Sequence, residues 1–316
     1  MLGLVGFSYT LNDGYCEDET CVGRNVLSLL LQFYQVFPQL LSVPLYVTGE
    51  SYGGHYVPAV SYAIHMHNLQ ASRSQSAHSA SRKIGTLKQS KLAELPLAGL
   101  AIGDGWVDPV NMVPAYPQMF LNQGHCDLKQ MKVVQQYCDE TVTHIQAGDY
   151  MGAFQSWDKL INGDIWPYGN YFHNISGLND YDNYMNTNAP QALNYYGEWV
   201  NQASTQKLVR LNTSCLTTLC LRIQQCLNAN CARAVVQLHV GQRPFQSGST
   251  CEQHLLNDFM VSLRPQLETL LDNKSIFTGK PYKVLIYSGQ LDVIIGAALT
   301  EAFLPLLTWH ASDEFV

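Results

Sequence analysis

The sequence contains no long apolar segment, and none of its runs approaches the roughly 18 consecutive apolar residues of a membrane-spanning helix. Charged residues make up only 14% of the 316 residues, which excludes a coiled coil and a disordered acidic chain. The 18 basic and 25 acidic side chains leave a net charge of −7, which argues against a nucleic-acid partner. With 47% hydrophobic residues, we expect a globular protein of one large domain or two smaller ones.

A recognisable secretion signal is also missing. The segment Met1-Leu2-Gly3-Leu4-Val5 is too short for the apolar region of a signal peptide and lacks a basic start. The cysteine content nevertheless favours a secreted or lumenal protein with disulfide bonds. A candidate for export without an export signal indicates an incomplete amino terminus. The nine cysteines are Cys16, Cys21, Cys126, Cys138, Cys215, Cys220, Cys226, Cys231 and Cys251.

Zinc binding is the alternative use of these cysteines, because several pairs enclose only a few residues. No complementary histidine cluster accompanies them, so we predict disulfides, no metal site and no other cofactor. The odd count leaves one cysteine without a partner. Three segments fit the glycosylation pattern, of which roughly two are expected by chance. They are Asn174-Ile175-Ser176, Asn212-Thr213-Ser214 and Asn273-Lys274-Ser275.

One turn organises the rest of the chain. A short apolar run ends at Thr48, and a segment compatible with a helix follows Gly54. Between them Gly49-Glu50-Ser51-Tyr52-Gly53 fits G-x-S-x-G, the strand-to-helix turn that presents a nucleophilic serine. The glycines allow a tight turn, and the amides at the start of the helix can stabilise an oxyanion. An ordinary Gly/Ser turn is the alternative, and the strand context and Gly54 argue against it.

Helices and strands alternate around this turn. Apolar residues recur with helical spacing over residues 22–37, and Pro38 follows as a stop. The helix after the turn runs to about Asn68, and a strand is predicted over residues 96–102. We interpret the Ser-rich and basic stretch 70–92 as a solvated surface loop, with a basic docking patch as the alternative. This alternation predicts a parallel α/β sheet.

The middle of the chain loses this rhythm and is rich in Asn, Gln, Tyr and Cys, with weaker helices over residues 129–145 and 191–211. We predict a hydrolase core in residues 1–110, an inserted cap in residues 111–251 and the rest of the core in residues 252–316. Three tryptophans of the cap can line a pocket or pack the insertion, and packing is favoured. They are Trp157, Trp166 and Trp199.

A further strand over residues 282–287 leads to Asp292. An aspartate after a buried parallel strand, and after the serine in chain order, is where the acid of an α/β-hydrolase triad belongs. Its alternative role is to cap a loop. The triad histidine should follow, but His310 is the only candidate, and we interpret it as a surface or packing residue. We place His55 on the helix after the turn, and not across from Ser51.

The ten residues from Gly49 to Pro58 resemble the serine carboxypeptidase signature, which is far more specific than G-x-S-x-G. The resemblance covers nearly the whole chain and is strongest to the vitellogenic carboxypeptidase-like branch. It implies an α/β-hydrolase fold with a cap, and the release of C-terminal residues from peptides, in lysosomes or outside cells. The other matching segments are Val5-Gly6-Phe7-Ser8-Tyr9-Thr10, Gly99-Leu100-Ala101-Ile102-Gly103-Asp104-Gly105, Asp108-Pro109, Tyr181-Asp182-Asn183-Tyr184, His239-Val240-Gly241, Leu285-Ile286-Tyr287-Ser288-Gly289-Gln290-Leu291-Asp292 and Leu299-Thr300-Glu301.

Carried over by position, the resemblance makes Ser51 the nucleophile, Asp292 the triad acid and the Tyr52 amide one oxyanion donor. Glu50, in its protonated form, would bind the terminal carboxylate of a peptide substrate, so binding weakens as the pH rises. Two parts of the family pattern are absent: the Trp-x-Asn-Gly-Gly-Pro-Gly segment, which supplies the second oxyanion amide, and the histidine in its Gly-x-His-x-x-Pro context. We therefore expect a truncated chain with very little activity.

Two other functions are compatible with these residues. A non-catalytic binding or regulatory homologue would keep Ser51 as a relic, although the intact turn and Asp292 argue against decay of the site. An acyltransferase on the same scaffold would pass the acyl group to an alcohol in place of water. Glu50 favours a carboxylate-bearing substrate and hence the peptidase.

Overall fold

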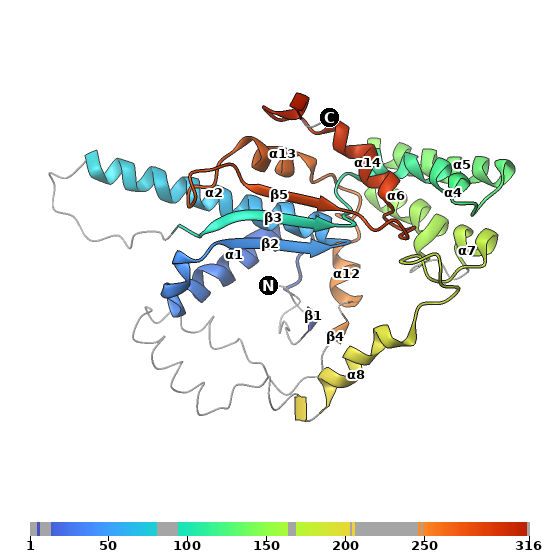
Figure 1. The fold of residues 1–316 in the computed structure, drawn as a ribbon, viewed down its shortest axis with the longest axis horizontal. Coiled ribbons are helices and arrows are strands. Elements are labelled where there is room, and N and C mark those ends of the chain that lie inside the picture. Colours follow the sequence, from blue (N-terminus) through green and yellow to red (C-terminus); the bar gives the residue numbers. More distant parts are fainter. Residues whose placement is uncertain are drawn as a thin grey trace. The chain divides into compact units, whose positions relative to one another are not determined.

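A computed structural model describes residues 5–6, 14–80, 94–163, 169–202, 204–205, 246–247 and 249–314 (Figure 1). The chain divides into two compact units. One consists of Glu17–Ala189 and Leu256–Val316, and the other of Met1–Cys16 and Pro190–Leu255. The first of these, which we call the sheet unit, contains every residue predicted to act in catalysis.

The sheet unit is built on three parallel strands, β2 (Leu45–Glu50), β3 (Leu97–Gly103) and β5 (Lys283–Tyr287), in the order β2-β3-β5. All three strands were predicted from the sequence, and the structure confirms them. Because the strands are parallel, their carboxyl ends meet at one edge of the sheet, as Figure 1 shows. β3 lies in the middle and is almost entirely buried, in keeping with its continuous apolar run.

One face of this sheet carries small residues on its central strand. Gly99, Ala101 and Gly103 of β3 stand in register with Tyr46, Thr48 and Glu50 of β2 and with Lys283, Leu285 and Tyr287 of β5. A side chain at Gly103 would collide with the ring of Tyr287. Tyr46, Leu285 and Tyr287 are all exposed on this face, which we call the open face of the sheet.

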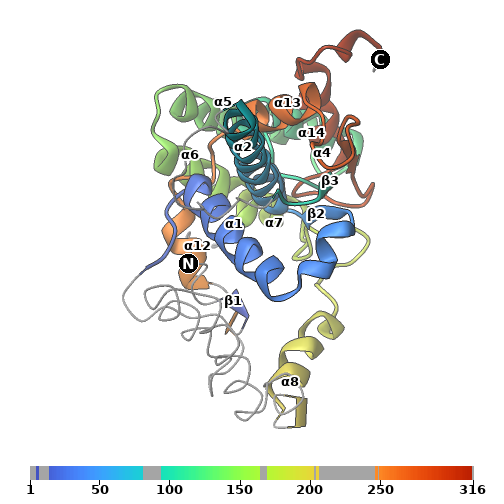
Figure 2. The same ribbon diagram turned by 90° about the vertical axis from the view of Figure 1, so that its left-hand side faces the viewer.

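Helices α1 (Glu19–Val36) and α2 (Gly53–Ala80) pack against each other (Figure 2), and α2 also packs on β2 and β3. α1 confirms the helix predicted over residues 22–37. It begins where the Asp18 side chain accepts a hydrogen bond from the amide of Cys21, and it ends before Pro38. Close contact of the two helices requires Gly23, because a Cβ there would lie 2.8 Å from the carbonyl oxygen of Ala59.

The predicted surface loop over residues 70–92 is wrong in its first part, because α2 continues to Ala80. Residues 70–80 contain no glycine or proline and include three alanines, so nothing in the local sequence stops the helix. The serine and arginine residues that suggested a loop do not prevent helix formation. Residues 81–93 lie outside the described part of the chain.

The remaining helices of the sheet unit enclose an aromatic core. α5 confirms the helix predicted over residues 129–145 and starts with a capping box between Asp127 and Gln130. Trp157 is buried against Trp106 and Phe154, as the packing interpretation predicted. The helices are α3 (Pro109–Met112), α4 (Tyr116–Asn122), α5 (Leu128–Gln146), α6 (Tyr150–Trp157), α7 (Tyr171–Ser176), α13 (Arg264–Asp272) and α14 (Ala297–Phe303). Shorter turns of helix are η1 (Pro38–Ser42), η2 (Val113–Ala115), η3 (Asp158–Asn162), η5 (Leu304–Leu306) and η6 (Ser312–Glu314).

The second unit contains an antiparallel pair of short strands, β1 (Val5–Gly6) and β4 (Gln246–Ser247). Its helical elements are η4 (Gln191–Asn194), α8 (Tyr195–Asn201) and α12 (Ser249–Leu255). The helix predicted over residues 191–211 is helical as far as Asn201, and most of its remainder lies outside the described residues. Trp199 is exposed on α8, so packing is not its role there, and Trp166 is not described.

Cys16 and Cys21 each take part in a disulfide bond, which confirms the predicted use of cysteine. Cys126 and Cys138 are buried thiols. In the described part of the chain no cluster of His, Cys, Asp and Glu could hold a metal ion. No helix there is long and apolar enough to cross a membrane. The division into a hydrolase core and a cap at residues 111–251 stays a prediction.

The start of α2 packs so closely on the chain after β3 that only glycine fits at residue 54. A Cβ at Gly54 would overlap the backbone of Trp106, whereas a Cβ at the neighbouring Gly53 would have no atom within 4 Å. We expect Gly54→Ala to lower the free energy of unfolding by about 2–4 kcal/mol, because backbone atoms cannot move aside as a side chain can.

Gly53→Ala is the matched control in the same helical turn. It should leave the free energy of unfolding unchanged or raise it by up to about 1 kcal/mol, since alanine favours the helix. Urea unfolding of the two variants measures the difference. Equal stabilities of the two would contradict the close packing at Gly54.

Candidate active site

Ser51 sits on a strained turn between β2 and α2. Its φ of 81° lies in the left-handed region, which a residue with a Cβ seldom adopts. Three backbone hydrogen bonds hold it there. The Ser51 amide donates to the carbonyl of Gly103 at 3.0 Å, and the Ser51 carbonyl accepts from the amides of Gly54 at 2.9 Å and Trp106 at 3.0 Å. The serine side chain is exposed at the end of the sheet, which is the geometry of a nucleophile turn.

The residues around Ser51 keep the turn tight. A Cβ at Gly49 would lie 3.0 Å from a methyl group of Val57 and 3.1 Å from the Cα of Gly53, so a larger residue there would push the strand away from the helix. α2 begins at Gly53, and its first amides therefore lie beside Ser51. The amide of Tyr52 has no acceptor among the described residues, so it is available to an incoming oxyanion.

Asp292 reaches the same edge of the sheet from the loop after β5. It is only 8% exposed, and its Oδ1 accepts a hydrogen bond of 3.0 Å from the amide of Ile295. The segment 181–184 binds this loop through backbone hydrogen bonds. The Tyr181 carbonyl accepts from the amide of Val293 at 2.8 Å, and the Tyr184 amide donates to the Leu291 carbonyl at 3.1 Å. These contacts leave Asp292 little freedom to move.

Asp104 is a residue of the candidate site that the sequence interpretation missed. It follows β3 with φ 41°, and its amide donates to the Tyr287 carbonyl at 2.9 Å. Its carboxylate accepts from the amide of Gly289, and so ties the loop after β3 to the loop that carries Asp292. The available signal was an aspartate between two glycines directly after a buried strand.

Carboxyl groups gather at this edge and oppose one another's ionisation. Burial is the main cause that raises the pKa of Asp292 to about 7; Asp104 and Asp182 raise it further, while the amide of Ile295 lowers it. The pKa of Asp182 is raised by burial, by Asp180 and then by Glu50 and Asp104. An aspartate that orients a catalytic histidine has to be ionised. Asp292 therefore needs a cation beside it before it can act at acidic pH.

Among the described residues, no histidine side chain forms a hydrogen bond or ion pair with Ser51 or Asp292. His310 is exposed, and both its amide and its ring bind Asp272 at the end of α13, at 2.7 and 3.2 Å. His55 is buried on α2, where its ring donates to the Trp106 carbonyl and stacks on Tyr52. Burial lowers the pKa of His55 to about 4. The sequence interpretation anticipated both positions.

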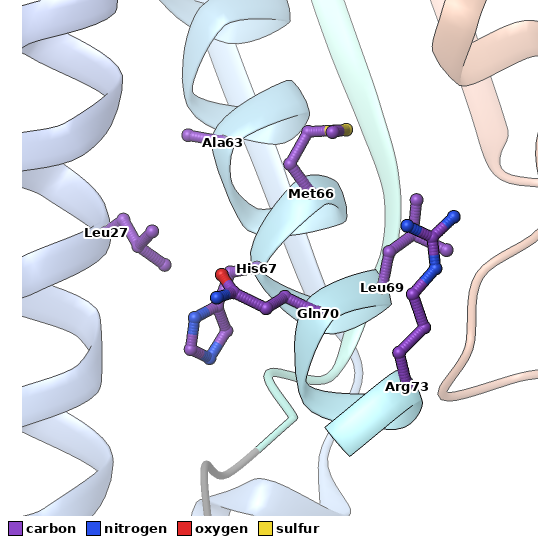
Figure 3. A pocket seen from close by; sticks show the side chains of 7 residues that line it. All are labelled: Leu27, Ala63, Met66, His67, Leu69, Gln70 and Arg73. Atoms are coloured by element: carbon purple, nitrogen blue, oxygen red, sulfur yellow. The ribbon is translucent and has the colours of Figure 1, made fainter. Parts of the chain in front are cut away.

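A cavity of about 520 Å³ lies between α1 and α2 (Figure 3). In Figure 3 Ala63 and His67 of α2 point toward Leu27 of α1, whereas Met66 and Arg73, which also line the cavity, point away from Leu27. Ala63 is ten residues from the start of α2, which corresponds to about 15 Å along the helix. The cavity is therefore separate from the turn at Ser51, and none of the predicted catalytic residues lines it.

Comparison with known proteins places these observations in a family. Residues 3–316 match the family described as serine carboxypeptidase. The probable serine carboxypeptidase CPVL of Homo sapiens is 32% identical over 311 residues, which cover 98% of this chain and 53% of that protein. The venom serine carboxypeptidase of Apis mellifera is 32% identical over 98% of this chain and 55% of its own. The vitellogenic carboxypeptidase of Aedes aegypti is 28% identical, with 98% and 54% covered.

This chain thus spans about half the length of the curated relatives that it matches. Among solved structures, a prohormone-processing carboxypeptidase of Saccharomyces cerevisiae, Kex1(delta)p, superimposes with a TM-score of 0.54. The two share 16% sequence identity, over 96% of this chain and 58% of that one. The predicted α/β-hydrolase fold is confirmed. With its family match over nearly all residues, the chain belongs to the serine carboxypeptidase family.

Proposed function

We propose that the whole protein is a serine-type carboxypeptidase that releases C-terminal residues from peptides through an acyl-enzyme on Ser51. The observation that carries this proposal is the positive φ of Ser51 on the turn between β2 and α2, beside the uncommitted amide of Tyr52. Membership of the serine carboxypeptidase family supports the choice of reaction. Because the chain spans about half of its relatives' length, the activity is proposed for the whole protein.

In the proposed reaction the Ser51 hydroxyl attacks the carbonyl carbon of the last peptide bond. The Tyr52 amide donates to the oxyanion that forms, and collapse of this intermediate releases the C-terminal residue and leaves an ester on Ser51. Water then hydrolyses the ester and regenerates the serine. A histidine must take the serine proton and pass it to the leaving amine. We assign Asp292 to orient that histidine, which is not among the described residues.

Glu50 is proposed to bind the terminal carboxylate of the substrate. It is the last residue of β2, directly before Ser51, and its side chain is exposed at the candidate site. Two carboxyl groups can share a hydrogen bond only when one of them is protonated, so this binding requires acidic conditions. The proposed substrates are therefore peptides with a free C-terminal carboxylate.

We propose a lysosomal or secreted location. The disulfide bonds of Cys16 and Cys21 support an oxidising compartment during folding. One relative is named as a venom carboxypeptidase, which is compatible with secretion.

A non-catalytic homologue is the second candidate. The observation in its favour is that Asp292 has no histidine partner in the described part of the chain. A binding protein of this kind would keep the Glu50 site for C-terminal carboxylates without cleaving the peptide.

Ser51→Ala should lower the rate of C-terminal residue release by the whole protein at least about 10³-fold, because no other group can form the acyl-enzyme. The measurement is mass spectrometry of a peptide substrate at about pH 5. Ser42→Ala, an exposed serine at the end of η1, is the control and should retain full activity. If both the unmodified protein and Ser51→Ala bind the peptide and neither cleaves it, the non-catalytic homologue is favoured.

Glu50→Gln should make substrate binding less sensitive to pH, because a glutamine donates the same hydrogen bond at every pH. For peptides with a free carboxylate, we expect the unmodified enzyme to show a KM that rises with pH, because the two carboxyl groups can share a hydrogen bond only while one of them is protonated. In the variant this rise should be largely lost, with little change in kcat at pH 5. Peptides with an amidated C-terminus serve as the control, and an unchanged pH profile of KM in Glu50→Gln would argue against carboxylate binding by Glu50.

A further inference from the structure

Glu19 is a buried acid that the proposed reaction does not use. It is the first residue of α1 and is only 5% exposed. Among the described residues, neither of its side-chain oxygens has a hydrogen-bond partner. Its backbone amide donates to Oδ2 of Asp258 at 3.0 Å, which brings a second carboxyl group beside it. A buried acid beside a half-buried one, without a counter-charge, is unfavourable when both are ionised.

A short segment connects this acid pair to the turn at Ser51. Directly after Asp258, the ring of Phe259 stacks on the ring of Tyr52, with centroids 5.1 Å apart and planes 12° apart. The carbonyl of Phe259 accepts from the indole of Trp106 at 2.9 Å, and the backbone amide of Trp106 donates to Ser51. The amide of Leu263 also binds the Val107 carbonyl at 2.9 Å. Residues 258–263 therefore contact both the Tyr52 ring and the chain that holds Ser51.

The groups facing Glu19 are acidic or neutral. Asp258 and Asp18, the N-cap residue of α1, both repel a negative charge on Glu19. Glu19, Asp258 and Tyr56 in turn oppose ionisation of Tyr52. The hydroxyl of Tyr52 is buried and has no partner in the described part of the chain. Burial raises the Tyr52 pKa well above its usual value, so this side chain stays neutral.

His55 stacks on Tyr52 and lies near Phe259, but its lowered pKa of about 4 keeps it uncharged above that pH. No cation among the described residues therefore compensates Glu19 and Asp258. Burial, then Asp258, then Asp18 raise the pKa of Glu19 to about 8. Burial is also the main cause that raises the pKa of Asp258 to about 6, with a smaller contribution from Asp18 and an opposing one from the Glu19 amide.

We propose that Glu19 and Asp258 form a proton-dependent latch, which holds residues 258–263 and the Tyr52 ring in place only while Glu19 is protonated. Ionisation of Glu19 would put a buried negative charge beside the half-buried carboxylate of Asp258 and push the 258–263 segment away from α1. Tyr52 would then lose the ring that packs on it, and its amide would lose its fixed position beside Ser51. Glu19 is thus a positioning residue, and it acts through Tyr52.

The sign of the pH dependence follows from the direction of the shift. The folded pKa of Glu19, about 8, lies above the usual 4.5, so the folded state holds this proton more tightly than the unfolded state. Below pH 4.5 both states carry the proton and the latch is intact. As the pH rises from about 4.5 to 8, the stability that the protonated Glu19 contributes to the folded state is lost progressively. Above pH 8 this contribution is gone. The latch is therefore closed at acidic and neutral pH and opens as the pH rises through about 8.

The proposal rests on the proposed function in one respect only, the role of the Tyr52 amide as a donor to the oxyanion. Its test uses this chain without substrate, so it can fail while the peptidase proposal holds, and the reverse is equally possible. The primary measurement is urea unfolding at pH 5, 7 and 9 of the unmodified chain and of Glu19→Gln, which keeps the shape of the side chain without its charge. Glu17→Gln, an exposed acid two residues away, is the matched control.

We expect the folding equilibrium constant of the unmodified chain to fall between pH 5 and pH 9 by about 100-fold more than that of Glu19→Gln. Glu17→Gln should follow the unmodified chain. Asp292 also holds its proton more tightly in the folded state, but it contributes equally to all three proteins and cancels in the comparison. An equal fall of the folding equilibrium constant between pH 5 and pH 9 in Glu19→Gln and in the unmodified chain would overturn the latch.

Hydrogen exchange provides the readout that a purely structural role for Glu19 would not change. After correction for the intrinsic exchange rate, amides in residues 51–56 and 258–263 should lose protection between pH 7 and pH 9 in the unmodified chain and keep it in Glu19→Gln. Unchanged protection in the unmodified chain would contradict the proposal. If Glu19→Gln does not fold, the same urea unfolding is measured for Asp258→Asn. A smaller fall of the folding equilibrium constant with pH than in the unmodified chain supports the latch, and an equal fall overturns it.

Discussion

The parallel pairing of β2, β3 and β5 is the constraint on which the candidate site depends. It carries Ser51, Asp104 and Asp292, which are far apart in the sequence, to one edge of a single sheet. Hydrogen bonds between the loops then fix them: Gly103 and Trp106 hold Ser51, and Asp104 holds the loop of Asp292. The left-handed backbone at Ser51 costs about 1–3 kcal/mol, and these contacts make it the stable conformation. The site is a property of the sheet edge rather than of any one loop.

The carboxyl groups of the molecule show a common pattern. Asp292 at the sheet edge and Glu19 behind Tyr52 both have raised pKa values, chiefly because they are buried. In both places other acids lie nearby, and no cation among the described residues offsets them. Such an arrangement favours the folded state at acidic pH and destabilises it at alkaline pH. The raised pKa values of these two acids thus favour acidic conditions, on grounds independent of the disulfide bonds and the family.

The sequence predicted the parts of this structure that local patterns determine. The strand before Ser51, the tight turn, and the existence and end of α1 follow from apolar spacing, glycine and proline, and the structure confirms them. The extension of α2 to Ala80 was missed because serine and arginine were interpreted as loop formers where no residue breaks the helix. Glu19 and Asp258 are 239 residues apart, and an acid at the start of a helix usually faces solvent. Their meeting could not be derived from the sequence, and neither could the bond from Asp104 to Gly289.

The open face of the sheet has a practical consequence for handling the chain. In the described part of the chain β2 and β5 are edge strands, so each carries one row of backbone groups that no neighbouring strand occupies. Beside these edges Tyr46, Leu285 and Tyr287 leave apolar surface in contact with water. Unpaired edges next to apolar side chains are a common starting point for the stacking of strands from different molecules. The concentration that a solution of this chain tolerates is therefore expected to be set by self-association, and dilute, low-salt conditions at a pH away from its isoelectric point of about 5.8 are the appropriate starting point for its purification.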